Sequence, residues 1–339
     1  MNKSEHMVTV ALSNDELFFK NYTSFEAKAV IKMSVLLFLC VLTNCFNGIL
    51  IYCYFRYPIF MENSRYVLFI HMVFNDSFEL TIGLTMHIWL EATPLMLVPV
   101  CYTLLVIAVS STLNNPINLA LMALERYIAI CKPLHHPKFC TFYRCIAILG
   151  LAWVISAIPA ITDLIIVFCV EPLSFFRTSM YCVRGSLFRA PFQEQNRLIT
   201  QVILFTSVTL IIILTYIQIV SAARSASLSK KSSAKKAYNT VLLHGIQLML
   251  SMLAFLAPLT DNLIWSLPNQ YQKDLSFFRY IIAYVIPRLL SPLIYGIREE
   301  NFRKHLRECL PGWLNNIRPL NLNIIVKPRG KKDKRVRAS

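Results

Sequence analysis

The feature that most constrains this chain is a series of long apolar stretches separated by short polar connections. Seven of them lie near 29–54, 66–90, 98–124, 143–169, 198–222, 237–263 and 277–297. Each is close to the roughly 20 residues that an α-helix needs to cross about 30 Å of hydrocarbon. Because a bilayer offers no water to satisfy backbone polar groups, such stretches cross it as helices. We therefore predict an all-α membrane protein, a seven-transmembrane helix bundle over 29–297.

The distribution of charge predicts how this bundle is oriented. The formal net charge of +16 would by itself suggest a nucleic-acid or anionic-lipid partner. However, 23 of the 34 lysines and arginines fall in four segments, 56–65, 125–144, 223–236 and 298–339. Positive connections mark the cytoplasmic side of a membrane protein. We expect a plasma-membrane protein with an extracellular segment over 1–28, a cytoplasmic C-terminus, lipid contact and no nucleic-acid partner.

Two sequence features fall on the predicted outer face. Asn21-Tyr22-Thr23 is a glycosylation sequon, and so is Asn2-Lys3-Ser4, although such triplets also occur by chance. Of ten cysteines, only Cys101, Cys169 and Cys182 lie at or beyond the outer edge. A bond between Cys101, which opens the third span, and Cys182, in the middle of the next outer loop, would hold that loop across the bundle mouth. We favour this pairing, which leaves Cys169 as a buried thiol.

Enzyme chemistry has no support in the sequence. The chain lacks the H-E-x-x-H, G-x-S-x-G and G-x-x-x-x-G-K patterns of zinc hydrolases, serine hydrolases and phosphate loops. His135 and His136 are adjacent rather than spaced along one helix face, which makes a metal site improbable. We expect neither an enzyme nor a cofactor or metal.

Polar residues inside the apolar spans are the stronger functional signal. Asn47, Asp76 and Ser291 each interrupt an apolar helix, and we expect them to form an intramembrane polar network. The alternative is that small polar side chains only hold helices together, which is more plausible for Asn47 than for the carboxylate of Asp76. Arg288 could pair with Asp76 or Glu79, a more plausible role than binding an acidic ligand.

The end of the chain predicts a mobile helix followed by an interfacial one. Pro292 removes a backbone hydrogen bond from the seventh span, and Pro287 precedes it, so this helix should kink. The segment 298–310 places apolar residues at three-to-four spacing among charges, which is typical of a short cytoplasmic amphipathic helix. Cys309 there is a possible palmitoylation site, and an unmodified thiol is equally compatible with the pattern. A basic tail, 311–339, follows.

Three separated motifs resemble those of one receptor family. The stretch M-A-L-E-R-Y-I-A-I-C-K-P-L from Met122 is similar to the odorant-receptor signature M-A-x-D-R-Y-x-A-I-C-x-P-L. Lys236-Ala237-Tyr238-Asn239-Thr240, followed by His244, resembles K-A-x-x-T-x-x-x-H at the start of the sixth helix. P-R-L-L-S-P-L-I-Y-G-I-R resembles P-x-x-N-P-x-I-Y-x-x-R in the seventh. Together with Trp153 in the fourth span, these motifs resemble rhodopsin-like (class A) G-protein-coupled receptors, within them the odorant receptors, and most closely those of fish.

The resemblance implies a mechanism and a set of switch residues. An extracellular ligand would shift the bundle between two states and open a cytoplasmic crevice for a heterotrimeric G protein of the olfactory stimulatory kind. The residues implied in this switch are Glu125, Arg126, Tyr127, Tyr216, Lys236, His244, Pro292 and Tyr295. Two departures stand out. Glu125 replaces the usual Asp and keeps its charge, whereas Ser291 replaces an Asn that helps Asp76 to hold sodium, which puts ion binding in doubt.

A ligand pocket is expected one to three helical turns below Cys101. Depth and helical period select Leu105, Ala108, Val109, Thr112, Thr200, Gln201, Leu204, Phe255, Leu259 and Tyr284. This part of the third span contains no carboxylate, so a dedicated partner for an amine is absent there. A mostly apolar pocket with a few hydroxyl and amide groups suits a small, weakly polar odorant ligand.

Two other functions remain open at this stage. A class A receptor for an endogenous peptide or lipid, expressed outside the nose, would share the fold, although the sixth-helix motif argues against it. A transporter or channel would be expected to show inverted repeats or a polar ion path, and the sequence has neither.

Overall fold

The structure is a computed structural model of the full chain. It describes residues 3–93, 95–182, 187, 191–227, 249–250, 253, 260, 263–264, 266–298, 302 and 304–305. Side chains are described for these residues except 3–27, 191, 223–227, 269–270, 273 and 293–298. Most of the sixth predicted span, together with Lys236, His244, Phe255, Leu259, Cys309 and the basic tail, therefore lies outside the described residues.

Long helices make up nearly all of the described chain. They are α1 (Lys3–Arg56), α3 (Ser64–Ala92), α4 (Val98–Cys131), α6 (Phe142–Val170), α8 (Pro191–Ser227), α11 (Asn269–Tyr280) and α12 (Ile286–Arg298). Two single-turn helices, α2 (Pro58–Met61) and α5 (His136–Phe139), lie in the connections. Within the described residues, five helices are long and apolar enough to cross a bilayer, and they match the first five predicted spans.

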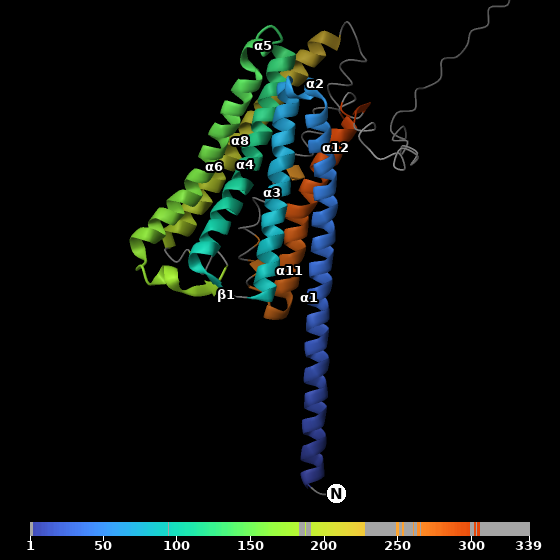
Figure 1. Ribbon diagram of the computed structural model, residues 1–339, viewed down its shortest axis with the longest axis vertical. Coiled ribbons are helices and arrows are strands. Elements are labelled where there is room, and N and C mark those ends of the chain that lie inside the picture. Colours follow the sequence, from blue (N-terminus) through green and yellow to red (C-terminus); the bar gives the residue numbers. More distant parts are fainter. Residues whose placement is uncertain are drawn as a thin grey trace, which may run out of the picture.

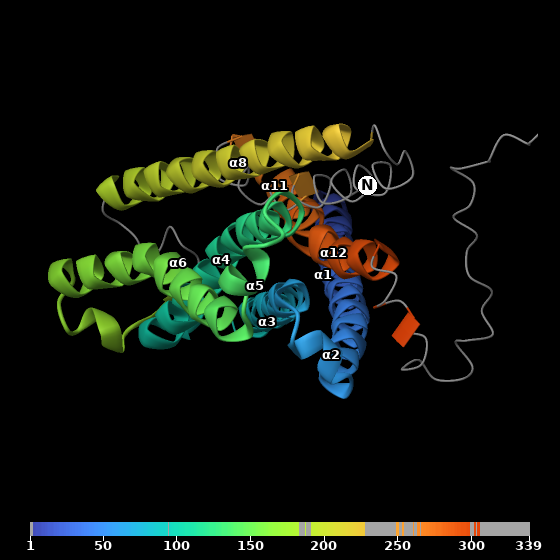
Figure 2. The same ribbon diagram turned by 90° about the horizontal axis from the view of Figure 1, so that it is seen from above.

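Helix α4 occupies the centre of the bundle. It packs against α3, α6 and α8, while α1 packs against α3 on the far side. Figure 2 shows α4 between α8 and the α3–α6 pair, with α1 and α12 farther along. Trp153 of α6 donates its indole N–H to Nε2 of His71 on α3, 2.8 Å away. Helix α1 begins at Lys3 and extends well beyond the bundle, so residues 3–28 of the predicted extracellular segment continue the first transmembrane helix as helix (Figure 1).

Large apolar side chains face outward along the helices. Phe38 on α1, Val154 on α6 and Val202 on α8 are 65%, 61% and 64% exposed. In water, apolar surface of this extent would be unfavourable, whereas lipid tails solvate it. Polar side chains of the same helices, such as Asn47 on α1, Ser156 on α6 and Thr215 on α8, are instead buried in the bundle. This inside-out pattern is that of a membrane-embedded bundle.

A short two-stranded sheet lies across one end of the bundle. Strand β1 (Leu95–Leu97) pairs antiparallel with β2 (Ser179–Tyr181), with Met96 opposite Met180. The predicted disulfide between Cys101 and Cys182 is confirmed, with the two Cα atoms 5.6 Å apart. It joins the first turn of α4 to the segment just after β2. We call this the disulfide end of the bundle. Cys169 is exposed on α6, so the prediction of a buried thiol was wrong.

The opposite end is closed by aromatic packing, and we call it the Glu125 end. Phe302 is fully buried, with its ring centroid 5.1 Å from that of Phe60. Lys304, two residues on, is exposed. The described residues of the predicted amphipathic segment 298–310 are thus helical, with the aromatic side chain turned inward. Its full extent remains a prediction.

The seventh predicted span is a continuous helix with one widened turn. Residues Ile281–Val285, between α11 and α12, form a π-helical turn in which the Ile286 N–H bonds to the Ile281 carbonyl. Pro287 follows directly and has no N–H to offer, so the normal hydrogen-bond ladder is interrupted here. Pro292 lies inside α12 and is buried. The irregular turn lies upstream of Pro287, and the predicted kink at Pro292 stays a prediction.

Candidate functional site

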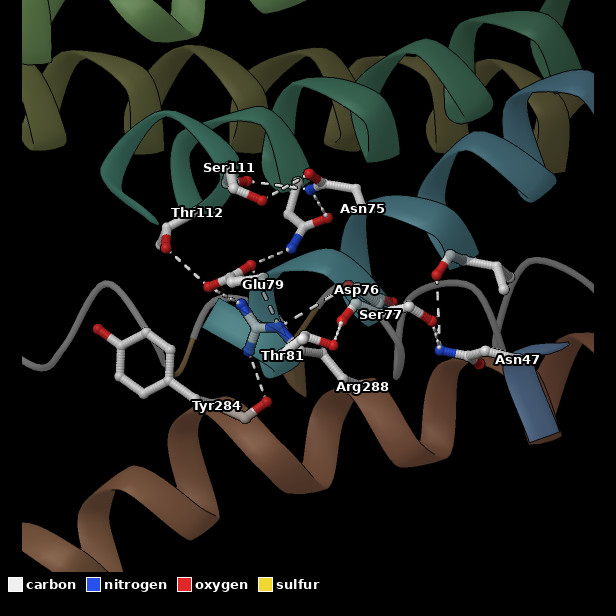
Figure 3. Close-up of polar contacts among 12 residues, drawn as sticks. Asn47, Asn75, Asp76, Ser77, Glu79, Thr81, Ser111, Thr112, Tyr284 and Arg288 are labelled. Atoms are coloured by element: carbon white, nitrogen blue, oxygen red, sulfur yellow. Dashed lines mark hydrogen bonds and ion pairs between the residues drawn. The ribbon is translucent and has the colours of Figure 1, made fainter. Parts of the chain in front are cut away.

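A buried ion pair links the second and seventh membrane helices. Arg288 of α12 places Nη2 2.5 Å from Oε1 of Glu79 on α3, and its Nε donates to Oε2 at 3.2 Å. The remaining terminal nitrogen, Nη1, donates to the carbonyl oxygen of Tyr284, 2.5 Å away in the widened turn. Figure 3 shows the guanidinium between the two helices, with each donor directed at one of these oxygens. The arrangement fixes α12 against α3.

The Glu79 carboxylate also receives two hydrogen bonds from α4. Thr112 Oγ1 donates to Oε1 at 2.7 Å, and Asn115 Nδ2 donates to Oε2 at 3.0 Å. Asn75 continues this layer, because its amide donates to Asn115 Oδ1 and it accepts from the Ser111 hydroxyl at 2.6 Å. Glu79 is therefore the centre of a polar layer that crosses α3, α4 and α12 (Figure 3).

The predicted network of Asn47, Asp76 and Ser291 is only partly assembled around this layer. Asp76 lies 3.8 Å from Arg288 Nε, so the guanidinium is shared by two carboxylates and makes its closer contact with Glu79. Asn47 donates to the Ser77 hydroxyl at 2.8 Å and so ties α1 to α3. Ser291 is buried about one turn beyond Arg288. The network was predicted around Asp76, whereas in the structure Glu79 holds more of the contacts.

Burial makes this cluster energetically sensitive. The side chains of Arg288, Glu79 and Asp76 are 6%, 8% and 5% exposed. Ions buried this deeply persist only when their charge and hydrogen-bonding groups are met by partners. The Arg288 guanidinium lies between the two carboxylates. The chain itself therefore supplies the positive charge that balances them.

A cavity of about 370 Å³ opens immediately toward the disulfide end from this layer. Among the described residues, the lining comes from α3, α4, α8 and the α11–α12 helix, with Cys182 from the loop above. Five of the predicted ligand contacts line it: Ala108, Val109, Thr112, Gln201 and Tyr284. Leu105 and Leu204 instead pack against apolar clusters near the disulfide end and the Glu125 end, and Thr200 is not part of the lining.

Residues of α3 are a large part of the lining that the sequence did not indicate. Met86, His87 and Leu90 face the cavity from this helix, as do Glu79 and Gly83. A Cβ atom at Gly83 would collide with the Tyr280 hydroxyl, so only glycine lets the tyrosine lie this close to α3. The depth argument placed no contact on the second span, and nothing in its apolar pattern distinguishes the face turned toward the cavity.

At the Glu125 end, the Glu125 carboxylate has three neighbours. Its Oε1 lies 3.0 Å from His136 Nε2 and accepts the Ser64 hydroxyl at 3.2 Å, while Oε2 is 3.9 Å from Arg126 Nε. Glu125 is 5% exposed, so these contacts are shielded from solvent. The sequence predicted the Arg126 pairing, which is present but long. It did not predict His136, whose position depends on how the loop after α4 folds back.

The other proposed switch residues are distributed around this end. Tyr127 is half-buried on α4, and Tyr216 on α8 packs against the large apolar cluster that contains Phe60. Tyr295 belongs to α12, with its side chain outside the described part of the structure. Cys140 lies near Glu125. Burial, and then the negative charge of the Glu125 carboxylate, raise the pKa of the Cys140 thiol, so the thiol stays neutral beside that carboxylate. A switch role for these residues remains a prediction.

Comparisons with known proteins agree with this geometry. The model of the seven-transmembrane receptor family (rhodopsin family) matches residues 46–295. The chain is 30% identical to odorant receptor 131-2 of Danio rerio over 77% of its own length and 80% of that receptor. It is 29% identical to olfactory receptor 4F17 of Homo sapiens over 58% of its own length and 63% of that receptor. It is also 29% identical to olfactory receptor 4F4 of Homo sapiens, over 57% of its own length and 62% of that receptor.

Proposed function

Because this chain belongs to the rhodopsin family of seven-transmembrane receptors, we propose that it binds a small molecule in the cavity below the disulfide-held strand pair β1–β2 and activates a G protein at the Glu125 end. Its similarity to odorant receptors makes it an odorant G-protein-coupled receptor. Neither the family nor its described residues supply enzyme chemistry.

The cavity is the observation that carries the ligand site. Its volume of about 370 Å³ lies at the lower end of the range typical of small-molecule pockets. Apolar side chains of α3 and α4 form its walls, and the layer around Glu79 and Arg288 forms its floor. A ligand can be desolvated along its length there and still meet a few polar groups that fix its orientation. The disulfide supports this proposal, since it holds the loop over the cavity.

The floor offers a route from the ligand to the far end of the bundle. Arg288 contacts both the cavity and α3, and it belongs to the helix that carries Pro292 and Tyr295. A ligand shifts the bundle only if it binds one of its two states better than the other. We therefore expect the difference in ligand affinity to come from contacts that change when the α11–α12 helix moves. Tyr284 lines the cavity from the widened turn of this helix and is one such contact.

The Glu125 end supports the coupling role. Glu125 holds Arg126 on α4 and His136 in the following loop, so its contacts join two elements that a docking partner would separate. Leu134 in that loop is 92% exposed, an apolar side chain available to a protein partner. We propose Glu125, Arg126, Tyr127, Tyr216, Lys236, His244, Pro292 and Tyr295 as the coupling residues.

We propose the orientation from charge. The Lys- and Arg-containing segments 56–65 and 125–144 lie at the Glu125 end, which supports a cytoplasmic position for that end and an extracellular one for the disulfide end. The same orientation exposes Asn21 to glycosylation and Cys309 to palmitoylation. An epitope tag before α1 should be stained on intact cells, and a tag after residue 339 should be stained only after permeabilisation. The reverse staining would overturn the orientation.

The ligand site and the switch can be tested together by cyclic-AMP accumulation in cells that express the full chain. Small carboxylic acids, alcohols, amines, steroids and nucleotides would serve as the panel. Val109→Trp fills the cavity and should abolish the response, whereas Val154→Trp, on the outward face of α6, should not. Arg126→Ala should abolish signalling at unchanged surface level. A full response from Val109→Trp would show that ligands act elsewhere, and one from Arg126→Ala would refute the switch.

A further inference from the structure

One wall of the cavity is built from aromatic rings that rest on one another. The Tyr280 and Tyr284 rings are nearly parallel, with their centroids 5.5 Å apart, and the His87 ring meets Tyr280 edge-on with a centroid distance of 4.6 Å. At the floor of the cavity, the Arg288 guanidinium lies 5.4 Å from the Tyr284 ring centroid. We call His87, Tyr280 and Tyr284 the ring wall, because all three line the cavity.

The absence of a side chain at Gly83 determines where the ring wall lies. A Cβ atom at this position would overlap the Tyr280 hydroxyl oxygen, whereas it would lie 3.4 Å from Cζ, the ring carbon that carries the hydroxyl. The first contact is sterically impossible, and the second is at the short end of ordinary van der Waals contact. The hydroxyl group therefore requires the glycine, while the ring without its hydroxyl would fit beside an alanine.

A Tyr280 ring displaced from Gly83 would move into the cavity. Toward α1, the ring packs against an apolar cluster in which Leu36 is fully buried. Close packing of this kind leaves no space into which a ring can retreat. His87 and Tyr284 flank the same ring. Among the described residues, the open side of Tyr280 is therefore the cavity, which it lines together with Gly83.

The width of the cavity depends on the position of the ring wall. Helix α4 contributes the short side chains of Ala108, Val109 and Thr112 to the lining, whereas the ring wall contributes bulk. The cavity volume of about 370 Å³ is at the lower end of the range typical of small-molecule pockets, so a modest inward shift of one ring changes which molecules fit. A difference of one methylene in an apolar pocket already changes the preference between ligands by about tenfold or more.

We propose that Gly83 is a specificity-determining residue of this receptor, because it accommodates the Tyr280 hydroxyl against α3 and so keeps the ring out of the cavity. With glycine at this position the cavity admits ligands that contain a ring. With alanine, the displaced Tyr280 ring restricts it to slender, unbranched molecules. This inference rests on the proposed function, since it concerns the ligand size that the same cavity accepts.

Thiol labelling measures the width of the cavity without a known agonist. Ala108→Cys places a thiol in the lining of the full-length purified receptor. Methyl and benzyl methanethiosulfonate are neutral reagents that attach a narrow or a wide group to a thiol as a disulfide and release methanesulfinate. The ratio of the benzyl rate to the methyl rate at residue 108, read by mass spectrometry, reports the width, because the reactivity of the thiol itself cancels.

Matched glycine substitutions supply the comparison. Adding Gly83→Ala to Ala108→Cys should lower the benzyl-to-methyl ratio by about tenfold, since the Tyr280 ring then narrows the space. Gly150→Ala makes the same change in α6, where a Cβ atom would meet nothing within 4 Å in the described structure, and it should leave the ratio unchanged. A ratio that Gly83→Ala does not lower overturns the proposal.

A compensating substitution separates this role from a general packing defect. Tyr280→Phe removes the hydroxyl and keeps the ring, so Gly83→Ala should have little effect in that background, and the ratio should return to within about twofold of that of Ala108→Cys alone. The same compensation should restore surface expression if Gly83→Ala alone lowers it. A ratio that stays low in the Tyr280→Phe background would show that the hydroxyl is not the cause and would overturn the proposal.

Signalling links the width of the cavity to ligand choice. Among agonists found by cyclic-AMP accumulation, Gly83→Ala should lower the potency of ring-containing molecules relative to unbranched ones, and an equal loss for both would overturn the proposal while the ligand site stands. A thiol at residue 108 that reacts with neither reagent would have a different meaning. It would show that small molecules do not reach the cavity, which would refute the proposed ligand site and, with it, this inference.

Discussion

Removing Arg288 should destabilise the bundle strongly, since its partners cannot follow it out of the interior. In Arg288→Met the side-chain volume is roughly kept, but Glu79 and Asp76 lose their cation while remaining almost fully buried. The Tyr284 carbonyl loses a donor as well. Breaking a buried ion pair from one side typically costs 3–5 kcal/mol, because the remaining charge is left uncompensated. We expect a loss of about 4 kcal/mol in the free energy of unfolding.

Two matched variants show whether charge is the cause. Arg288→Lys keeps a cation but cannot contact Glu79 through two nitrogens and reach Tyr284 at once, so about half of the loss should remain. The triple variant Asp76→Asn, Glu79→Gln, Arg288→Met removes all three charges. Replacing buried ion groups by neutral ones of similar volume is often close to neutral, so the triple variant should recover most of the stability.

Thermal unfolding of the detergent-solubilised receptor measures these differences. The apparent Tm of Arg288→Met should fall by about 10 °C, and that of the triple variant should return to within a few degrees of the unmodified receptor. The comparison works as a mutant cycle, in which the recovery reports the coupling between the charges. An Arg288→Met receptor as stable as the unmodified one would refute the reasoning. A triple variant as unstable as Arg288→Met would show that packing, and not charge, explains the loss.

Three further predictions concern other contacts. His136→Ala removes a hydrogen bond to the buried Glu125 carboxylate and should raise basal cyclic-AMP several-fold. The control is His135→Ala, which removes a ring that stacks on Phe139 and should leave basal cyclic-AMP unchanged. Equal effects of the two variants would contradict a restraint of His136 on Glu125. Cys101→Ser and Cys182→Ser should lower surface expression equally, and the double variant should be no worse than either; an additive loss would mean that the two thiols act separately. The hydrogen bond from Lys32 lowers the pKa of the Asp274 carboxyl, so this pair stabilises the fold at neutral pH and ceases to do so as the pH falls through that lowered value. Asp274→Asn should therefore lower the apparent Tm at neutral pH. The Tm difference between this variant and the unmodified receptor should disappear in strong acid, and a difference that did not change with pH would show that the contact is not ionic.

The sequence by itself determined the membrane class, the number of spans and the position of the outer bond. Each of these depends on sums over neighbouring residues, such as the apolar length of a helix or the Lys and Arg content of a loop. Cys101 and Cys182 were identified because few cysteines lie outside the spans. The five helices found long enough to cross a membrane match the predicted spans for the same reason.

Only the tertiary structure decided which polar residues meet. Glu79 and Arg288 are 209 residues apart, and their contact depends on how α3 and α12 are rotated about their axes. The same holds for Gly83 beneath Tyr280 and for His136 against Glu125. A membrane helix shows its apolar character on every side, so its sequence gives little sign of which face turns inward. Hydropathy is a local property, whereas the cavity and its charge arise where four helices, each turned to one particular angle, come together.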